Sequence, residues 1–177
     1  MTDLVDVVVE ADSWSSIDIA LLADRAVKLA FSALNLPTKG YEISLLACND
    51  ARIAELNAEY RGKNQPTNVL SWPAFELAAE RDGGPPKPLP EPDGMWAEAI
   101  GDLAIAYETC LNEAAIADIA FDHHLTHLVL HGCLHLLGYD HERPLDAALM
   151  EALETKALAS VGIDDPYSRS DYAGTEK

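Results

Sequence analysis

The segment HGCLHLLGYDH, residues 131–141, holds three of the chain's six histidines: His131, His135 and His141. If the segment begins in a helix, His131 and His135 lie one turn apart on one face. Gly138 can end that helix in a left-handed conformation at low cost, which would bring His141 back to the same face. Three neutral imidazoles suit Zn²⁺ and leave its fourth tetrahedral position open to water. We therefore predict a catalytic site with one Zn²⁺ per chain, where another divalent metal would also fit.

The same spacing matches the metzincin protease signature H-E-x-x-H-x-x-G-x-x-H at all but one fixed position. Gly132 stands in the place of the glutamate. In those proteases the glutamate takes a proton from the zinc-bound water, which a glycine cannot do. A zinc metallopeptidase is therefore kept only as an alternative.

Three more histidines and a cysteine lie on the same expected helix. His127 is one turn before His131, so it is a candidate partner of the metal ligands, a proton shuttle or a packing residue. We expect His123 and His124, near the helix start, to be solvated. Cys133 lies two residues from each helical histidine and points elsewhere, as a small buried side chain.

The elements that must position these residues indicate one domain of mixed α/β class (α+β) over residues 1–163. Valine-rich and alternating segments predict strands at residues 4–10, 41–48, 69–72 and 99–107. Apolar periodicity and capping residues predict helices at residues 15–34, 49–61, 109–120, 122–137 and 144–161. The result is a small mixed sheet of three to four strands packed by about five helices, with a central helix bearing His131 and His135.

Two segments do not fit regular structure. Prolines and glycines concentrate between residues 73 and 97, which predicts an inserted loop. Residues 164–177 form a polar C-terminal tail that we expect to fray.

The charge of the chain is strongly acidic, at a formal −18 over 177 residues. Such a chain repels polyanions, whereas nucleic-acid-binding proteins usually present a basic face. The stretch from Tyr60 to Phe75 differs, because it has no acidic residue and includes Arg61 and Lys63. Three cysteines, no long apolar run and no secretory signal predict a cytoplasmic protein without a membrane span.

Taken together, these motifs resemble the YbeY family, metal-dependent endoribonucleases that act as ribosomal RNA maturation factors. Residues 131–141 are similar to the family's H-G-x-L-H-L-x-G-Y-D-H signature at every fixed position. Residues 56–61 and 66–72 resemble its L-N-x-x-Y-R and P-T-D-V-L-S-F motifs, and residues 101–103 resemble its G-D-I strand. Asn68 departs from the pattern, since an aspartate is common there, and Trp72 replaces a phenylalanine.

The resemblance implies a divalent metal at the three histidines and cleavage of single-stranded RNA, in small-subunit ribosomal RNA 3′-end maturation and ribosome quality control. It also implies Arg61 as the arginine beside the metal, so that Arg61, His131, His135 and His141 are the candidate catalytic residues. A guanidinium can hold a phosphate through two parallel hydrogen bonds. We therefore expect Arg61 to hold the scissile phosphate, with Lys63, Asn68 and Ser71 as further substrate-binding candidates.

The attacking group and the partners stay open at this point. Either a metal-activated water or the 2′-OH of the RNA itself could attack the phosphate. The implied partners are ribosomal RNA and the small ribosomal subunit, together with protein partners that recruit an acidic enzyme to RNA. A non-catalytic ribosome assembly factor is the second alternative.

Overall fold

Within residues 3–168, which the computed structural model describes, the chain forms four strands and five α-helices. The strands are β1 (Val5–Val9), β2 (Tyr41–Cys48), β3 (Val69–Pro73) and β4 (Glu98–Ala106). The helices are α1 (Ile19–Ala33), α2 (Asp50–Arg61), α3 (Tyr107–Ala117), α4 (Phe121–Leu136) and α5 (Pro144–Ala159). The strand order is β1-β2-β4-β3, with β1, β2 and β4 parallel and the edge strand β3 antiparallel to β4. The predicted mixed fold is confirmed.

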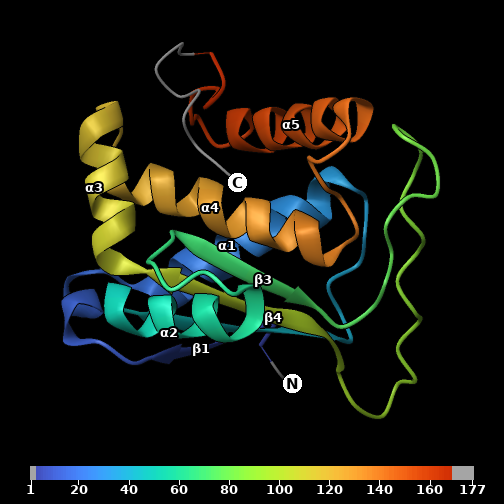
Figure 1. Ribbon diagram of the computed structural model, residues 1–177. Coiled ribbons are helices and arrows are strands. Elements are labelled where there is room, and N and C mark those ends of the chain that lie inside the picture. Colours follow the sequence, from blue (N-terminus) through green and yellow to red (C-terminus); the bar gives the residue numbers. More distant parts are fainter. Residues whose placement is uncertain (1–2, 169–177) are drawn as a thin grey trace.

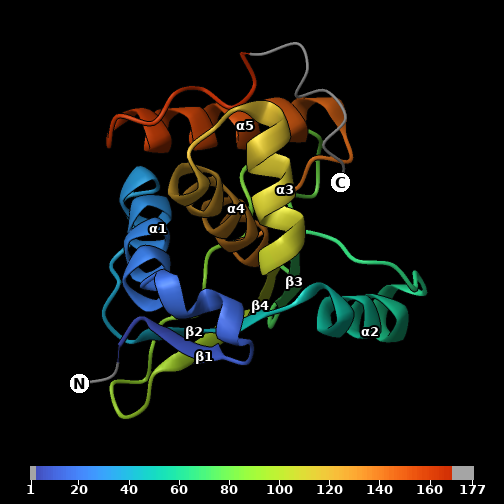
Figure 2. The same ribbon diagram turned by 90° about the vertical axis from the view of Figure 1, so that its left-hand side faces the viewer.

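Helices α1, α4 and α5 lie on one side of the sheet (Figures 1 and 2). Helix α4 is central, and Leu125, Val129 and Leu130 on it are fully buried. Successive strand residues point to opposite faces. Leu103 accordingly joins the core beneath α4, whereas Ala104 joins a smaller cluster beneath α2.

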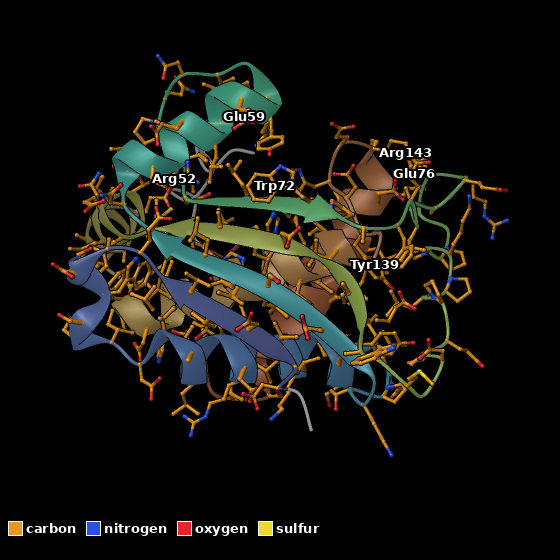
Figure 3. The ribbon with its side chains drawn as sticks, turned by 90° about the horizontal axis from the view of Figure 1, so that it is seen from below. Arg52, Glu59, Trp72, Glu76, Tyr139 and Arg143 are labelled. Carbon is orange, nitrogen blue, oxygen red and sulfur yellow. The ribbon has the colours of Figure 1, made fainter. Side chains whose placement is uncertain are left out.

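Helix α2 therefore covers the face of the sheet opposite α4. Figure 3 shows it alongside β3, with the ring of Trp72 directed toward it. Trp72 packs edge-on against Tyr60 of α2, with ring centroids 5.4 Å apart. The edge strand β3 consequently lies between the end of α2, which carries Arg61, and helix α4, which carries His131 and His135.

The first helix begins later than predicted. Asp18 caps it, because its carboxylate accepts a hydrogen bond from the backbone N–H of Leu21. The preceding residues, Asp12–Ser16, form a 3₁₀ turn instead. That turn buries Trp14, whose indole N–H donates to the carbonyl of Cys48 at 2.9 Å. The helix therefore starts only after the capping residue Asp18, and the residues before it pack through Trp14.

The loop expected at residues 73–97 begins one residue later, because Pro73 is the last residue of β3. Residues 74–97 form neither helix nor strand but are attached to the rest of the fold. Leu77 within it is buried. Arg143, just before α5, donates to the carbonyl oxygens of Ala79 at 2.9 Å and Glu80 at 3.3 Å. Figure 3 shows Arg143 beside this loop. The start of α5 therefore anchors the segment.

The C-terminal tail lies mostly outside the described residues. In its first five residues the expected fraying is not found, because Pro166 is buried and Tyr167 donates a hydrogen bond to α5. None of the described helices has both the length and the apolarity that a bilayer crossing requires.

Candidate metal centre

The end of α4 places the three histidines of segment 131–141 together. The backbone N–H of Gly138 donates to the carbonyl of His135, and that of Tyr139 donates to the carbonyl of Leu134. This pair of hydrogen bonds is the Schellman motif, which reverses a chain at a helix end. Gly138 has φ +99, and a Cβ there would lie 2.6 Å from the carbonyl oxygen of Leu77. Only glycine fits this turn, which carries His141 back over α4.

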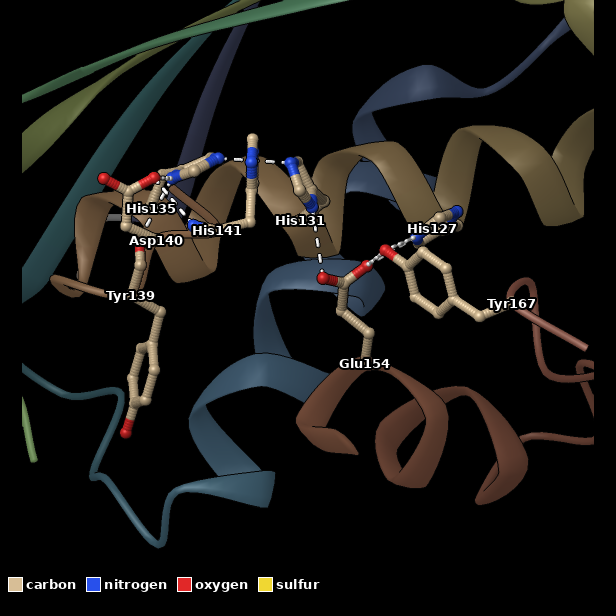
Figure 4. Close-up of polar contacts among 8 residues, drawn as sticks. All are labelled: His127, His131, His135, Tyr139, Asp140, His141, Glu154 and Tyr167. Atoms are coloured by element: carbon tan, nitrogen blue, oxygen red, sulfur yellow. Dashed lines mark hydrogen bonds and ion pairs between the residues drawn. The ribbon is translucent and has the colours of Figure 1, made fainter. Parts of the chain in front are cut away.

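The geometry of the three imidazoles suits a metal ion. Ligand atoms of His131, His135 and His141 all lie within 4.8 Å of one another, and Figure 4 shows the rings grouped at the end of α4. The Nε2 atoms of His131 and His135 are 3.1 Å apart. Two nitrogens on a tetrahedral Zn²⁺ are separated by about 3.3 Å, given Zn–N bonds of about 2.0–2.1 Å. The spacing therefore fits two ligands of one zinc ion.

The hydrogen bonds on the far side of each ring support the same conclusion. Nδ1 of His135 is 3.0 Å from the carbonyl oxygen of Tyr139, and Nδ1 of His131 is 3.1 Å from a carboxylate oxygen of Glu154. Both partners are acceptors, so each Nδ1 carries the proton. The two Nε2 lone pairs then face each other. A bound cation would relieve their mutual repulsion.

Burial keeps His135 in the neutral form that binds metals. Desolvation and the neighbouring His131 and His141 lower the pKa of His135 from 6.5 to about 4, against a smaller opposing effect of Asp140. Protons therefore compete weakly for this ligand at neutral pH.

A buried carboxylate, Glu154 of α5, completes the surroundings and was missed by sequence reasoning. It is fully buried, and its oxygens meet Nε2 of His127 at 2.5 Å and Nδ1 of His131 at 3.1 Å. Burial raises the pKa of Glu154, but the hydrogen bonds from His127 and His131 outweigh it and hold the pKa well below its usual range. One sequence signal existed. Glu154 falls at the helical period of the buried residues Met150, Ala157 and Leu158.

The basic residues predicted to meet RNA lie at the end of α2. Arg61 and Lys63 are exposed, and neither side chain has an ion-pair partner among residues 3–168. Arg52, earlier on α2, is paired with Glu10 and Glu55. Ser71 shares the sheet face of Val69, which packs against the core beneath α4. The arginine and lysine therefore remain available to an anionic ligand.

The relationship of this chain to known proteins follows from its sequence as a whole. A sequence model of the family described as Endoribonuclease YbeY matches residues 8–162. The chain belongs to the YbeY family. Proteins of that description from a Ruegeria species and from Ruegeria pomeroyi are 51% and 52% identical to it over 164 residues, covering 93% of this chain and 96% and 98% of theirs. A protein of that description from Cereibacter sphaeroides is 49% identical over 167 residues, covering 94% of this chain and 100% of its own.

A solved structure shares the fold of this chain. The solution structure of a protein from Thermotoga maritima superposes with a TM-score of 0.56 at 20% identity, covering 93% of this chain and 99% of that one.

Family membership leaves the metallopeptidase alternative without support, and the structure adds a physical reason. A Cβ at Gly132 would lie 2.8 Å from the side chain of Leu103 and 3.5 Å from that of Val69. A side chain at this position would therefore enter the packed contact between α4 and the sheet. Position 132 cannot hold the glutamate base of a metzincin in this fold.

Asn68, where the YbeY family pattern commonly has aspartate, forms hydrogen bonds to another side chain of the fold. Its Nδ2 donates to both oxygens of Glu113 on α3, at 3.1 and 3.2 Å. Glu113 also meets Nε2 of His124 at 2.9 Å. His124 is buried, so the expectation that it is solvated was wrong, and His123 is only partly exposed. An aspartate at position 68 would face Glu113 with like charge, which gives a local reason for the amide.

The pH dependence of the metal-free protein provides one prediction from this site. Because the pKa of His135 is about 4 when folded and about 6.5 when unfolded, the unfolded chain takes up a proton first as the pH falls. His135 should thus lower the free energy of unfolding by about 2 kcal/mol between pH 7 and pH 5. Urea titrations at both pH values would measure this decrease in the free energy of unfolding. In His135→Ala the decrease should be smaller by about 2 kcal/mol. An unchanged pH dependence in the variant would contradict the assignment.

Proposed function

We propose that this chain is a zinc-dependent endoribonuclease that cleaves single-stranded RNA, with His131, His135 and His141 holding the metal. The observation that carries the proposal is the convergence of three imidazoles whose ligand atoms lie within 4.8 Å of one another, with the Nε2 atoms of His131 and His135 3.1 Å apart. Membership of the YbeY family, whose description is an endoribonuclease, supports RNA as the substrate class. Another divalent metal would use the same ligands.

The bound metal and the side chains around it have different proposed roles in RNA cleavage. When bound, Zn²⁺ would supply Lewis acidity and lower the pKa of a coordinated water to about 7. Arg61 would hold the scissile phosphate and stabilise the negative charge that grows on it, because a guanidinium stays charged at every relevant pH. Lys63 and Ser71 are proposed as further contacts to the RNA backbone. Asn68 contributes less directly, because its amide is already bonded to Glu113.

Two routes of attack lead to different products. A water nucleophile leaves a linear phosphate, whereas attack by the 2′-OH leaves a 2′,3′-cyclic phosphate in the first step. Mass spectrometry of the fragments from a short single-stranded RNA distinguishes the two routes. A 2′,3′-cyclic product would exclude direct attack by water.

The proposed biological setting is the cytoplasm, in 3′-end maturation of small-subunit ribosomal RNA and in ribosome quality control. A net charge of −18 disfavours binding to bare RNA. We therefore propose that a protein partner on the small ribosomal subunit recruits the enzyme. The exposed side chains of Arg61 and Lys63 would then attract the RNA phosphates over a short range.

Depletion and rescue test this function in cells. After depletion, precursor ribosomal RNA with an extended small-subunit 3′ end should accumulate, and the wild-type protein should restore maturation. His135→Ala and Arg61→Ala should fail to do so at equal protein levels. Full rescue by both variants would favour a non-catalytic assembly factor and overturn the proposed activity.

A further inference from the structure

The buried carboxylate of Glu154 contacts Nδ1 of His131, on the side of the ring away from the proposed metal site. One oxygen is 3.1 Å from Nδ1 of His131, while the other meets Nε2 of His127 at 2.5 Å and the hydroxyl of Tyr167 at 2.6 Å. Figure 4 shows Glu154 reaching from α5 to α4 between His131 and His127. The carboxylate is thus surrounded by three donors from two other parts of the chain.

Burying an ionised carboxylate is costly, so this position calls for a physical reason. The loss of hydration destabilises the fold unless the charge is fully hydrogen-bonded. Neighbouring positions of α5 pack with apolar side chains, namely Met150, Ala157 and Leu158. Packing against α4 alone would be served better by another apolar residue. The charge at position 154 therefore indicates a role beyond holding α5 in place.

The contact to His131 has a direct effect on metal binding. A carboxylate acceptor stabilises the tautomer with the proton on Nδ1, which leaves the Nε2 lone pair directed at the metal site. It also fixes the plane of the ring and makes the imidazole a stronger donor. Nδ1 of His135 instead donates to a neutral acceptor, the carbonyl oxygen of Tyr139, at 3.0 Å, and the carboxylate of Asp140 lies farther away, at 4.0 Å. Nδ1 of His131 therefore donates to a charged acceptor, whereas Nδ1 of His135 donates to a neutral one.

We propose that Glu154 is a positioning residue that sets the tautomer and orientation of His131 for metal binding, with His127 and Tyr167 holding the carboxylate in place. This inference rests on the proposed metal site. It gives His127 a role as a partner of Glu154 rather than as a ligand or a proton shuttle.

A second ion among His127, His131 and Glu154 is the competing interpretation, because their ligand atoms also lie within 4.8 Å of one another. The distances oppose it. Two ligands of a tetrahedral Zn²⁺ are about 3.3 Å apart, whereas Nε2 of His127 and the Glu154 oxygen are separated by 2.5 Å. That is the distance of a direct hydrogen bond, which leaves no room for an ion between them.

The test measures zinc affinity in the full chain without relying on activity. Each metal-free protein would be titrated against a chromogenic chelator that competes for Zn²⁺, which gives its zinc affinity. The proteins compared are wild type, Glu154→Gln, His131→Ala and Glu151→Gln. Glu151 is the matched control, since it lies one turn earlier on α5 and makes no hydrogen bond to a histidine among the described residues. We expect Glu154→Gln to weaken zinc binding by about 10- to 100-fold. Glu151→Gln should leave it unchanged.

The outcomes separate this inference from the proposed function. If His131→Ala loses zinc but Glu154→Gln binds like wild type, the positioning role is wrong and the metal site stands. If neither variant changes affinity, the metal site itself fails. A stoichiometry of two Zn²⁺ per wild-type chain, falling to one in Glu154→Gln, would support the competing second site.

A measurement on the wild-type protein covers the case in which Glu154→Gln does not fold. Long-range ¹H–¹⁵N correlation spectra of the metal-free protein report the tautomer of each histidine. His131 should carry its proton on Nδ1. Finding the proton on Nε2 of His131 would overturn the proposal.

Discussion

Replacing His135 by alanine is expected to weaken Zn²⁺ binding by at least about 100-fold and to reduce RNA cleavage to background. Binding free energies of zinc sites, about 10–16 kcal/mol over four ligands, correspond to roughly 3 kcal/mol per ligand. His135 is also the proposed ligand that burial holds in the neutral state, with a pKa of about 4. Its loss leaves two imidazoles, which hold zinc too weakly to keep it at working concentrations. Chelator competition and cleavage of a labelled single-stranded RNA would measure both effects.

The matched control for this variant is His123→Ala. His123 lies near the start of α4, and no ligand atom of its ring belongs to the groups that could hold a metal among the described residues. The His123→Ala variant should bind zinc and cleave RNA like the wild-type protein. Equal zinc affinity in His123→Ala and His135→Ala would contradict the three-histidine site. Urea titrations must accompany the comparison, so that loss of folding is not taken for loss of a ligand.

Replacing Arg61 by alanine is expected to reduce kcat by about 100- to 1,000-fold while leaving zinc affinity unchanged. The estimate corresponds to removing one group that stabilises charge in the transition state, about 3–4 kcal/mol. Arg61 is exposed and has no ion-pair partner within residues 3–168, so its loss breaks no salt bridge of the described fold. Arg61→Lys should recover only part of the rate, because an ammonium group cannot form two parallel hydrogen bonds to a phosphate.

Arg52→Ala is the control for charge, since Arg52 lies on the same helix and is also partly exposed. Removing it changes the net charge equally and should alter kcat by less than about twofold. A comparable loss of rate in both variants would point to overall electrostatics rather than to a specific phosphate contact. Because trace nucleases could mask a true loss, all proteins must come from the same nuclease-free preparation.

Short-range patterns in the sequence were sufficient to locate the histidine cluster. The offset of four between His131 and His135 places them on one helix face, and Gly138 supplies the left-handed residue that reverses the chain. The same kind of local signal predicted β2 at its exact bounds and the end of α2 at Arg61 before Gly62. Each of these depends on backbone preferences within a few residues, which a sequence displays directly.

Features that depend on packing between distant elements were decided only by the tertiary structure. Glu154 meets His131 across 23 residues of sequence, and Asn68 meets Glu113 across 45. His124 is buried because α3 presents Glu113 to it, although its position near a helix start predicts exposure. The free energy of a buried charge depends on donors that other helices bring to it, so no local pattern could assign these partners. The sequence by itself located the three histidines that come together at the end of α4, and the packing of α3 and α5 on α4 decided that Glu113 contacts His124 and that Glu154 contacts His131.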